Sequence, residues 1–401
     1  MSLFRDKNFI AAALGHFMVD SLNGSRAIIL TFLSIPLGLT NTLLGLYTTF
    51  YVIAGAVAQP VFGHLADRVG LRRVIAGGIL WMAVFFSLGV VVQGRLALFF
   101  LVLASIGSGA FHAAGAAQAT MIGRHSLAGR ETFSASMFFV FGQSGYFIGP
   151  VIGGILLNRW EPVSLTSMAL LALITGLWAS FYRSPAVPVE AKTPGEKVSA
   201  PAFPWLFLLM LALTAGFQSW AQQNVNTFLP KYLSVLGQSP AQYGLVSALF
   251  MAGSAFGNLM GGGLADRFGR WRVISIALVA GSLPLFVLGQ IGSSFWLFAV
   301  IVLAGLFNGA AYSAVVVLSQ RLMPGGIALA SGLAMAFIFS SGSLGALVSG
   351  GIADKIGLAP IFTLSAVISL AGGLLALGLR EKRLTSQILV KPEPAISSHY
   401  Q

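Results

Sequence analysis

The stretch Gly63-His64-Leu65-Ala66-Asp67-Arg68-Val69-Gly70-Leu71-Arg72-Arg73 is a short charged island between two long apolar segments. A second copy, Gly262-Gly263-Leu264-Ala265-Asp266-Arg267-Phe268-Gly269-Arg270-Trp271-Arg272, begins 199 residues later (262 − 63). This offset is close to half of the 401-residue chain. The chain is therefore predicted to contain one structural unit written twice.

The composition of the chain indicates a membrane protein. Hydrophobic residues make up 56% of it and charged residues only 8%, whereas soluble domains contain roughly a quarter charged residues. The absence of cysteine excludes disulfides, thiolate metal sites and thiol catalysis. The net charge of +12 lies in short basic clusters between apolar spans, a pattern typical of membrane proteins. A lipid bilayer, and no nucleic acid, is the expected partner.

Twelve apolar segments follow one another, each near or above the roughly 20 residues that cross a bilayer as a helix. They are expected at about 9–37, 42–66, 74–93, 96–122, 132–158, 162–183, 204–232, 240–265, 273–292, 295–322, 326–353 and 358–380. The predicted fold is an all-α membrane protein with twelve transmembrane helices in two pseudo-symmetric six-helix bundles. The predicted domains are a bundle over 1–183, a proline-punctuated linker over 184–203, a bundle over 204–383 and a tail over 384–401.

The distribution of Lys and Arg predicts the orientation. If the N-terminus is cytoplasmic, 18 of the 23 Lys and Arg face the cytoplasm and four face outside. Because loops rich in these residues stay on the cytoplasmic side, both termini and the linker are predicted to lie there.

Shorter matches extend the repeat, and the whole pattern resembles a known family. Thr31-Phe32-Leu33 recurs as Thr227-Phe228-Leu229, and Gly153-Gly154-Ile155 as Gly350-Gly351-Ile352. Duplicated six-helix bundles are used by secondary transporters, which bind substrate between the halves at mid-membrane. With its doubled loop motif, the chain resembles the major facilitator superfamily over all twelve helices. The resemblance implies a monomeric transporter of a small molecule in the bacterial inner membrane, with alternating access between the bundles.

In that superfamily the loop after the second helix is a cytoplasmic latch. Its aspartate and arginines pair with neighbouring helix ends in the outward-facing state and separate in the inward-facing state. The resemblance assigns this role to Gly63, Asp67, Arg68, Gly70, Arg72 and Arg73, and in the second copy to Asp266, Arg267, Arg270 and Arg272. The alternative is that the arginines only orient the loops, which does not require the glycines and the aspartate at this spacing.

The fifth segment carries small residues every three or four positions. Gly145, Gly149, Pro150, Gly153 and Gly154 form a flat face for close helix packing, and the proline loosens the backbone ladder. The pattern resembles the antiporter motif of drug:proton exporters, and a generic packing seam is the alternative.

Asp20 is the only acid deep within a predicted span, and Arg26 is the only deeply placed Lys or Arg. Ionisable groups in a bilayer are costly and mark a transport pathway. His16, Asp20 and Asn23 share one face of the first helix, and Arg26 lies on its flank. Asp20 and His16 are predicted to exchange protons, and Arg26 to recognise an anion or tune Asp20. The alternative is a neutralised Asp20–Arg26 pair, or a hydrogen-bonded network, that only fixes helix packing.

Further polar residues are predicted to line the cavity. His112 lies on the fourth helix, which lines the cavity in this superfamily; proton coupling and plain cavity lining stay open for it. It aligns with Tyr312 through the repeat. The amides of the seventh helix are too many for a lipid-facing surface. The remaining candidate substrate-binding residues are Gln143, Tyr146, Gln218, Gln222, Asn226 and Asn308.

Within the superfamily, three segments resemble fosmidomycin-resistance-type exporters. They are Gly15-His16-Phe17-Met18-Val19-Asp20, 59–68 and Gly109-Ala110-Phe111-His112. Ala113 and Ala114 stand where those transporters have Pro-Glu, so a second cavity acid is missing.

The predicted function is proton-coupled efflux of a small anionic or amphiphilic molecule. A proton-coupled importer of a sugar, organic acid or other metabolite is one alternative, and a non-transporting receptor or scaffold is another. An enzyme is not expected, since no paired carboxylates, nucleophile constellation or metal cluster is recognised within the spans, and no cofactor is expected. A nucleotide-driven pump is excluded because the sequence has no Gly-x4-Gly-Lys-Ser/Thr loop.

Overall fold

The computed structural model describes residues 3–126, 131–181, 205–322 and 327–380. The predicted linker over 184–203, the predicted tail over 384–401 and the domain boundaries placed there lie outside the described residues.

Twelve α-helices account for almost all of the described chain, and no strand occurs in it. The first six are α1 Lys7–Ser34, α2 Asn41–Val69, α3 Leu71–Val91, α4 Leu96–Ser126, α5 Glu131–Arg159 and α6 Thr166–Phe181. The second six are α7 Trp205–Val235, α8 Pro240–Phe268, α9 Arg270–Ile291, α10 Leu297–Leu322, α11 Ile327–Ile356 and α12 Ala359–Leu375. Short 3-10 segments lie at Leu3–Arg5, Pro162–Leu165 and Ala376–Gly378. The predicted all-helical fold is confirmed.

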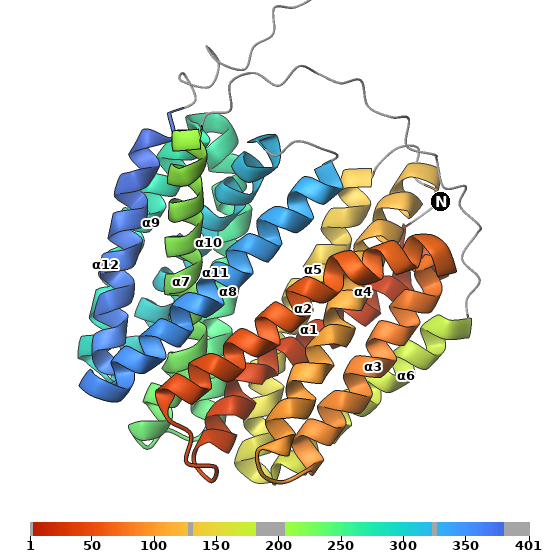
Figure 1. Cartoon of the computed structure of the whole chain (residues 1–401), viewed down its shortest axis with the longest axis horizontal. Helices are drawn as coiled ribbons and strands as arrows, with labels where there is room; N and C mark the ends of the chain where they lie inside the picture. Colours follow the sequence, from red (N-terminus) through yellow and green to blue (C-terminus); the bar gives the residue numbers. More distant parts are fainter. Residues whose placement is uncertain (1–2, 127–130, 182–204, 323–326, 381–401) are drawn as a thin grey trace, which may run out of the picture.

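The helices form two six-helix bundles with the same internal packing (Figure 1). In the first, α1 packs on α5, α2 on α4, and α3 on α4 and α6. The second repeats this scheme: α7 packs on α11, α8 on α10, and α9 on α10 and α12. Two pairs, α2 with α11 and α5 with α8, make the main contacts between the bundles. The sequence repeat thus appears as a repeat of packing.

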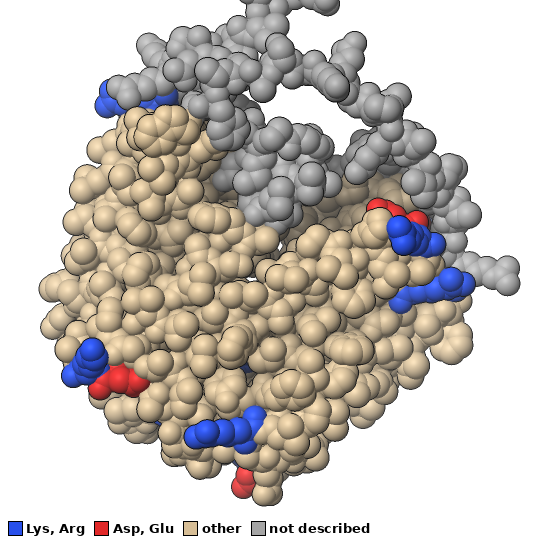
Figure 2. Space-filling model, viewed as in Figure 1, with Lys and Arg blue, Asp and Glu red and all other residues tan. Residues whose placement is uncertain are grey.

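The surface matches a bilayer. In the face seen in Figure 2, charged side chains gather near two opposite ends of the molecule, and the broad band between them is nearly free of charge. Within the described residues, ten helices are long and apolar enough to span a membrane. The two long helices outside this set are α1 and α7, which carry His16, Asp20, Asn23 and Arg26, and Gln218, Gln222 and Asn226, respectively. Helices that face a polar interior do not need to be apolar all round.

The loop motif joins α2 to α3 through a glycine that no other residue replaces easily. Gly70 ends α2 and starts α3 with a φ of +95°, and Gly269 does the same between α8 and α9 with a φ of +92°. Side chains rarely adopt such angles because the Cβ atom collides with the backbone. These positions explain one glycine of each motif copy by local geometry.

We call the end of the molecule that carries the Gly63–Arg73 motif the loop end, and the opposite end the far end. The bundles contact each other closely at the far end. Here Asp354 of α11 accepts hydrogen bonds from the backbone N–H groups of Asn41 (2.7 Å) and Thr42 (3.0 Å) at the start of α2. Thr49 donates to the carbonyl of Ser343 at 2.7 Å. In Figure 1, α2 and α11 meet at this end and diverge towards the other.

Candidate functional site

Asp20 is buried on α1, where two histidines hold its carboxylate. It is 7% exposed and lies in the middle of a predicted span. Nε2 of His16, one turn earlier on α1, lies 3.1 Å from Oδ2 of Asp20. Nε2 of His112, on α4, lies 3.2 Å from Oδ1. The three predicted proton-coupling residues therefore form one cluster, the His–Asp–His cluster.

Backbone carbonyls fix the orientation of both imidazole rings. Nδ1 of His16 lies 2.8 Å from the carbonyl oxygen of Phe138 on α5, and Nδ1 of His112 lies 2.8 Å from that of Ser108. Because a carbonyl oxygen only accepts hydrogen bonds, each Nδ1 must carry a hydrogen. The His16 ring also stacks on the Phe138 ring, with centroids 4.0 Å apart. Both Nε2 atoms consequently face the carboxylate.

Asn23 connects the cluster to α2 and α4. Its amide nitrogen donates to Oδ1 of Asp20 and to Oγ of Ser108, both at 2.9 Å. Its amide oxygen accepts from the hydroxyl of Tyr51 on α2 at 2.7 Å. Every polar atom of this half-buried amide therefore has a partner, which holds α1, α2 and α4 in register.

Arg26 does not pair with Asp20, contrary to the ion pair considered from the sequence. The carboxylate of Asp20 contacts the two histidines instead. The Arg26 guanidinium lies 4.9 Å from the centre of the Tyr51 ring. The side chain is only 6% exposed, and its Nε has no hydrogen-bond partner among the described residues. A buried cation without a carboxylate is costly unless something else compensates it.

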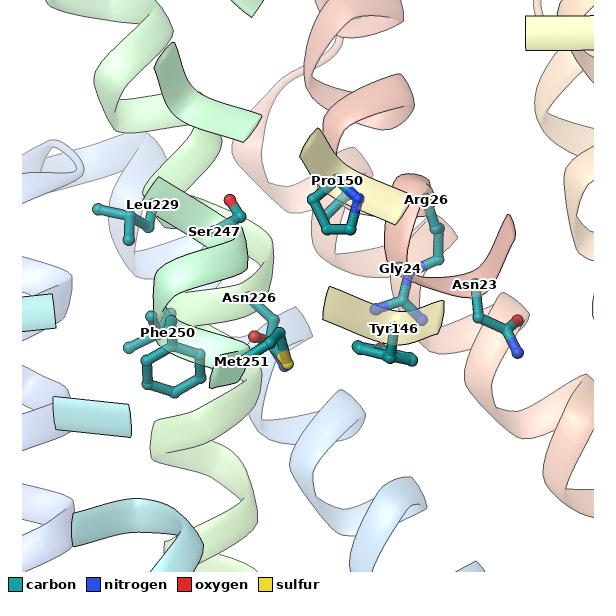
Figure 3. A pocket seen from close by; sticks show the side chains of 12 residues that line it. Asn23, Gly24, Arg26, Tyr146, Pro150, Asn226, Leu229, Ser247, Phe250 and Met251 are labelled. Atoms are coloured by element: carbon teal, nitrogen blue, oxygen red, sulfur yellow. The ribbon is translucent and has the colours of Figure 1, made fainter. Parts of the chain in front are cut away.

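Arg26 lines a pocket between the two bundles (Figure 3). The pocket is formed by α1 and α5 from the first bundle and by α7 and α8 from the second. In the close-up, the guanidinium extends beside Tyr146, and Asn23 points to the other side. Polar and apolar side chains share the lining: Asn23, Arg26, Tyr146, Asn226 and Ser247 against Ala27, Pro150, Val225, Leu229, Phe250 and Met251.

The amides of α7 divide into pocket-lining and helix-joining residues. Asn226 lies in the pocket wall. Gln218 is fully buried, and its Nε2 donates to Oδ1 of Asn308 on α10 at 2.9 Å. Gln222 accepts from Gln218 at 3.4 Å. Gln218 and Asn308, both predicted to bind substrate, thus bind each other.

Two further predicted residues lie apart from the pocket. Gln143 is exposed on α5. Tyr312 on α10 is half-buried and stacks on Phe339, with ring centroids 6.5 Å apart. Neither belongs to the pocket lining. For Tyr312, alignment with His112 through the repeat could not show this, because pseudo-symmetric positions need not have equivalent neighbours.

The predicted packing motif of α5 packs mainly on α1. A Cβ on Gly145 would meet the carbonyl of Phe17, and one on Gly149 would meet that of Ser21. Gly153 faces Ser25, with its ideal Cβ position 3.0 Å from Oγ. Gly154 and Pro150 lie against α8 instead, because a Cβ on Gly154 would meet the carbonyl of Pro240, and the Pro150 carbonyl faces Gly244. Both packing surfaces require the small residues.

At the loop end, Asp67 and Arg68 are exposed, and no described residue forms an ion pair with Asp67. Nη1 of Arg73 donates to the carbonyl of Val69 at 3.3 Å, and Nη1 of Arg272 donates to that of Phe268 at 3.2 Å. The remaining motif residues are Gly63 (half-buried), Arg72 (half-buried, with a partner), Arg267 (exposed) and Arg270 (buried, with a partner), whereas the side chain of Asp266 lies outside the described residues.

Sequence reasoning missed several residues of the site. Tyr51, Ser108 and Phe138 support the cluster, and Ser247, Phe250 and Met251 line the pocket. No spacing signal marks them, since each comes from a different helix than Asp20. The sequence also indicated no metal cluster, yet the ligand atoms of His16, Asp20 and His112 all lie within 4.8 Å of one another.

Known proteins share this sequence pattern and fold. The model of the Major Facilitator Superfamily matches residues 10–237 and 211–398. The chain is 26% identical over 382 residues to the fosmidomycin resistance protein of Escherichia coli (strain K12), covering 90% of each. It is 25% identical over 328 residues to the multidrug resistance protein MdtG of Salmonella typhi, covering 77% of this chain and 79% of that protein.

Solved structures share the fold at low sequence identity. A bacterial homologue of the human lysosomal transporter Spinster, in an inward-facing and occupied conformation, superposes with a TM-score of 0.81 and 14% identity, covering 98% of this chain and all of that one. The nucleoside transporter NupG gives a TM-score of 0.75 and 16% identity over 93% and 99% of the two chains. The family model covers most of the sequence, so the chain belongs to the major facilitator superfamily and is a multi-pass membrane transporter, not an enzyme.

Proposed function

We propose that the chain is a proton-coupled exporter of a small amphiphilic anion, working by alternating access as a monomer in the bacterial inner membrane. The observation that carries the proposal is Arg26. This cation is buried at the boundary between the bundles and lines a pocket that both bundles share, and its Nε finds no hydrogen-bond partner in the part of the chain that the structure describes.

The chemistry of the pocket supports an amphiphilic cargo. Arg26 offers a planar, permanently charged donor that suits a carboxylate, phosphate or phosphonate. Tyr146, Asn226 and Ser247 add neutral hydrogen-bonding groups around it. Across the pocket, Leu229, Phe250 and Met251 supply apolar surface. A cargo with an acidic group and an apolar part would satisfy both sides.

The His–Asp–His cluster supports proton coupling. It lies next to the pocket, because Asn23 hydrogen-bonds Asp20 and also belongs to the pocket lining. An anion bound at Arg26 changes the electrostatic potential at the His–Asp–His cluster and therefore the number of protons bound there. By linkage, protons bound at the cluster change the affinity for the anion by the same factor. Cargo and protons are therefore expected to influence each other's affinity across about one helical turn.

The arrangement of the bundles fits one state of the transport cycle. If the termini are cytoplasmic, the loop end faces the cytoplasm and the closed far end faces outside. An inward-facing state follows from that orientation, and the latch residues Asp67 and Arg68 are then expected to be released, in agreement with their exposure. The names of the relatives that act in drug resistance favour export over import.

Transport in proteoliposomes with an imposed pH gradient tests the proposal. Candidate anions are first screened by thermal shift on the purified protein at two pH values, since a ligand that binds only the native state stabilises it. The best ligand is then followed in both directions. Movement against its gradient driven by opposite proton movement supports export, whereas co-movement with protons would establish an importer.

Substitutions at Arg26 and Asp20 separate the roles of the two charged groups. The Arg26→Gln protein should no longer be stabilised by the ligand and should not transport it. The Arg26→Lys protein should keep only part of both activities, because an ammonium group cannot donate the two parallel hydrogen bonds of a guanidinium. Arg95→Gln, an exposed arginine between α3 and α4, is the matched control and should behave as the wild type. Asp20→Asn should abolish proton-driven transport, and undiminished coupled transport would contradict the proposal. A correctly inserted protein that tolerates both changes and moves no ligand would indicate a receptor or scaffold.

A further inference from the structure

We propose that His16, Asp20 and His112 form a binding site for one divalent transition-metal cation of the Zn²⁺, Co²⁺ or Ni²⁺ type. The site would be distinct from the Arg26 pocket, and it does not depend on the cargo or on the direction of transport. Two imidazoles and one carboxylate, all in the membrane interior, supply the ligands.

The spacing of the three groups is close to that around a single ion. The two imidazole nitrogens lie 3.1 and 3.2 Å from the oxygens of Asp20. Zinc ligands lie about 2.0–2.2 Å from the ion, so neighbouring ligand atoms are roughly 3–3.5 Å apart. The widest separation in the cluster is no more than 4.8 Å. Closing it onto one ion requires the outer ligand atoms to approach each other by roughly 1–2 Å.

The hydrogen bonds behind the imidazoles prepare both rings for metal binding. Each Nδ1–H donates to a backbone carbonyl, that of Phe138 for His16 and that of Ser108 for His112. In a neutral ring this leaves the lone pair on Nε2, directed at the shared carboxylate. Histidines that bind metals almost always donate their other N–H in this way. The cluster thus has both the ligands and their supporting contacts.

The same geometry requires positive charge between the side chains. If both rings were neutral, two nitrogen lone pairs would face carboxylate oxygens, and the contacts would be repulsive. Two protons, one on each Nε2, remove the repulsion and give the cluster a net charge of +1. One divalent cation between neutral rings gives the same net charge. Metal and the two protons are therefore alternatives at one site, and metal binding must release protons.

The ligand types indicate the class of metal. Imidazole nitrogen suits Zn²⁺, Ni²⁺ and Co²⁺, whereas Mg²⁺ and Ca²⁺ prefer oxygen ligands alone. Asn23 occupies part of the space at Oδ1 by donating a hydrogen bond to it. With three protein ligands, the ion keeps an open position for water or another small ligand, as in sites where zinc is exchangeable or catalytic.

Other charged groups nearby bear on the pH dependence. Among the described residues, the titratable or charged groups around the cluster are His16, Asp20 and Arg26 on α1, Tyr51 on α2, His112 on α4 and Tyr146 on α5. Arg26 is permanently charged and the two tyrosines stay neutral near pH 7. Because a metal binds only an unprotonated imidazole nitrogen and an ionised carboxylate, metal affinity should fall as the pH falls.

Metal titration of the purified full-length protein, without a polyhistidine tag, tests the site. Zn²⁺ binding is measured by calorimetry and Co²⁺ binding by visible absorption, each at pH 7.5 and 5.5. We expect one ion per chain at pH 7.5, binding at least tenfold weaker at pH 5.5, and no competition from Mg²⁺. The Co²⁺ spectrum should show the d–d bands of a nitrogen-ligated ion.

Variants show whether the metal occupies this cluster. Asp20→Asn and His112→Gln should each weaken binding at least tenfold. His64→Ala, which removes an exposed histidine on α2, should not change it. If either cluster variant fails to fold, the Co²⁺ spectrum of the wild type and its stabilisation by Zn²⁺ still show whether the protein binds a nitrogen-ligated metal ion. No stoichiometric binding by the wild type, or unchanged binding by a well-folded Asp20→Asn protein, would overturn the proposal. The cluster is also the proposed proton-coupling site, but these measurements record metal binding alone and transport is measured in proteoliposomes, so failure of one proposal is distinguishable from failure of the other.

Discussion

Asp354 is predicted to hold the far end closed, and removing its side chain should open that end. Its carboxylate, at the end of α11 in the second bundle, accepts two backbone hydrogen bonds and the Thr42 hydroxyl hydrogen bond at the start of α2 in the first bundle. The start of a helix has free N–H groups and the positive end of the helix dipole. Asp354 therefore acts as a helix cap supplied by the other bundle.

The contribution of this cap to closure can be estimated from its exposure. Hydrogen bonds to charged groups contribute about 1.5–3 kcal/mol each when they are buried. Asp354 is exposed, and an exposed charge at a helix start contributes only about 0.3–1 kcal/mol through the dipole, with about 1 kcal/mol for a capping side chain. We expect Asp354→Ala to shift the equilibrium by about 1–2 kcal/mol, which is roughly a 5- to 30-fold increase in the far-end-open population.

Distances between spin labels measure this population directly. The sequence contains no cysteine, so two engineered cysteines label the protein at known positions. Trp160 and Phe295 are exposed at the far end, one in each bundle, and can be replaced by cysteine. In nanodiscs, Asp354→Ala should increase the long-distance fraction. Asp354→Asn should have a smaller effect, because asparagine is also a good helix cap.

Lys355→Ala provides the matched control. Lys355 is the next residue on α11 and is also exposed, so its removal should leave the distance distribution unchanged. An unchanged distribution in Asp354→Ala, or an equal change in Lys355→Ala, would refute the cap.

Three further predictions concern helix packing. Gly149→Val should weaken the α1–α5 contact, since even a Cβ at this position would meet the Ser21 carbonyl; we expect a lower unfolding temperature in detergent, while Gly77→Ala, where a Cβ meets nothing within 4 Å, should match the wild type. Gly70→Ala should destabilise the α2–α3 junction by about 1–3 kcal/mol because of its positive φ, measured as thermal unfolding, and an unchanged unfolding temperature would contradict the strain. Gln218→Leu should destabilise the second bundle by about 1–3 kcal/mol, because Oδ1 of Asn308 loses its donor while Nδ2 keeps the backbone carbonyl of residue 218; adding Asn308→Leu should restore part of the loss, and additive losses in the double variant would argue against the pair.

The sequence alone determined the helices, their number and their grouping. An apolar segment of about 20 residues that crosses a bilayer forms a helix, because its backbone must satisfy its own hydrogen bonds in lipid. The doubled motif, with Gly70 and Gly269 at equivalent positions, determined which helices of the two bundles correspond to each other. Asp20 stood out because an acid deep in an apolar span is rare.

Only the tertiary structure decided the partners of these residues. The spacing of His16 and Asp20 shows that they share a helix face, but His112 follows Asp20 by 92 residues (112 − 20) and reaches it only through the packing of α4 on α1. From its position on α1, Arg26 could recognise an anion, tune Asp20 or pair with it; only the structure places its side chain in the pocket between the bundles and not against Asp20. Periodicity fixes which residues share one helix face, whereas the rotation of each helix about its axis follows from how all the side chains pack together.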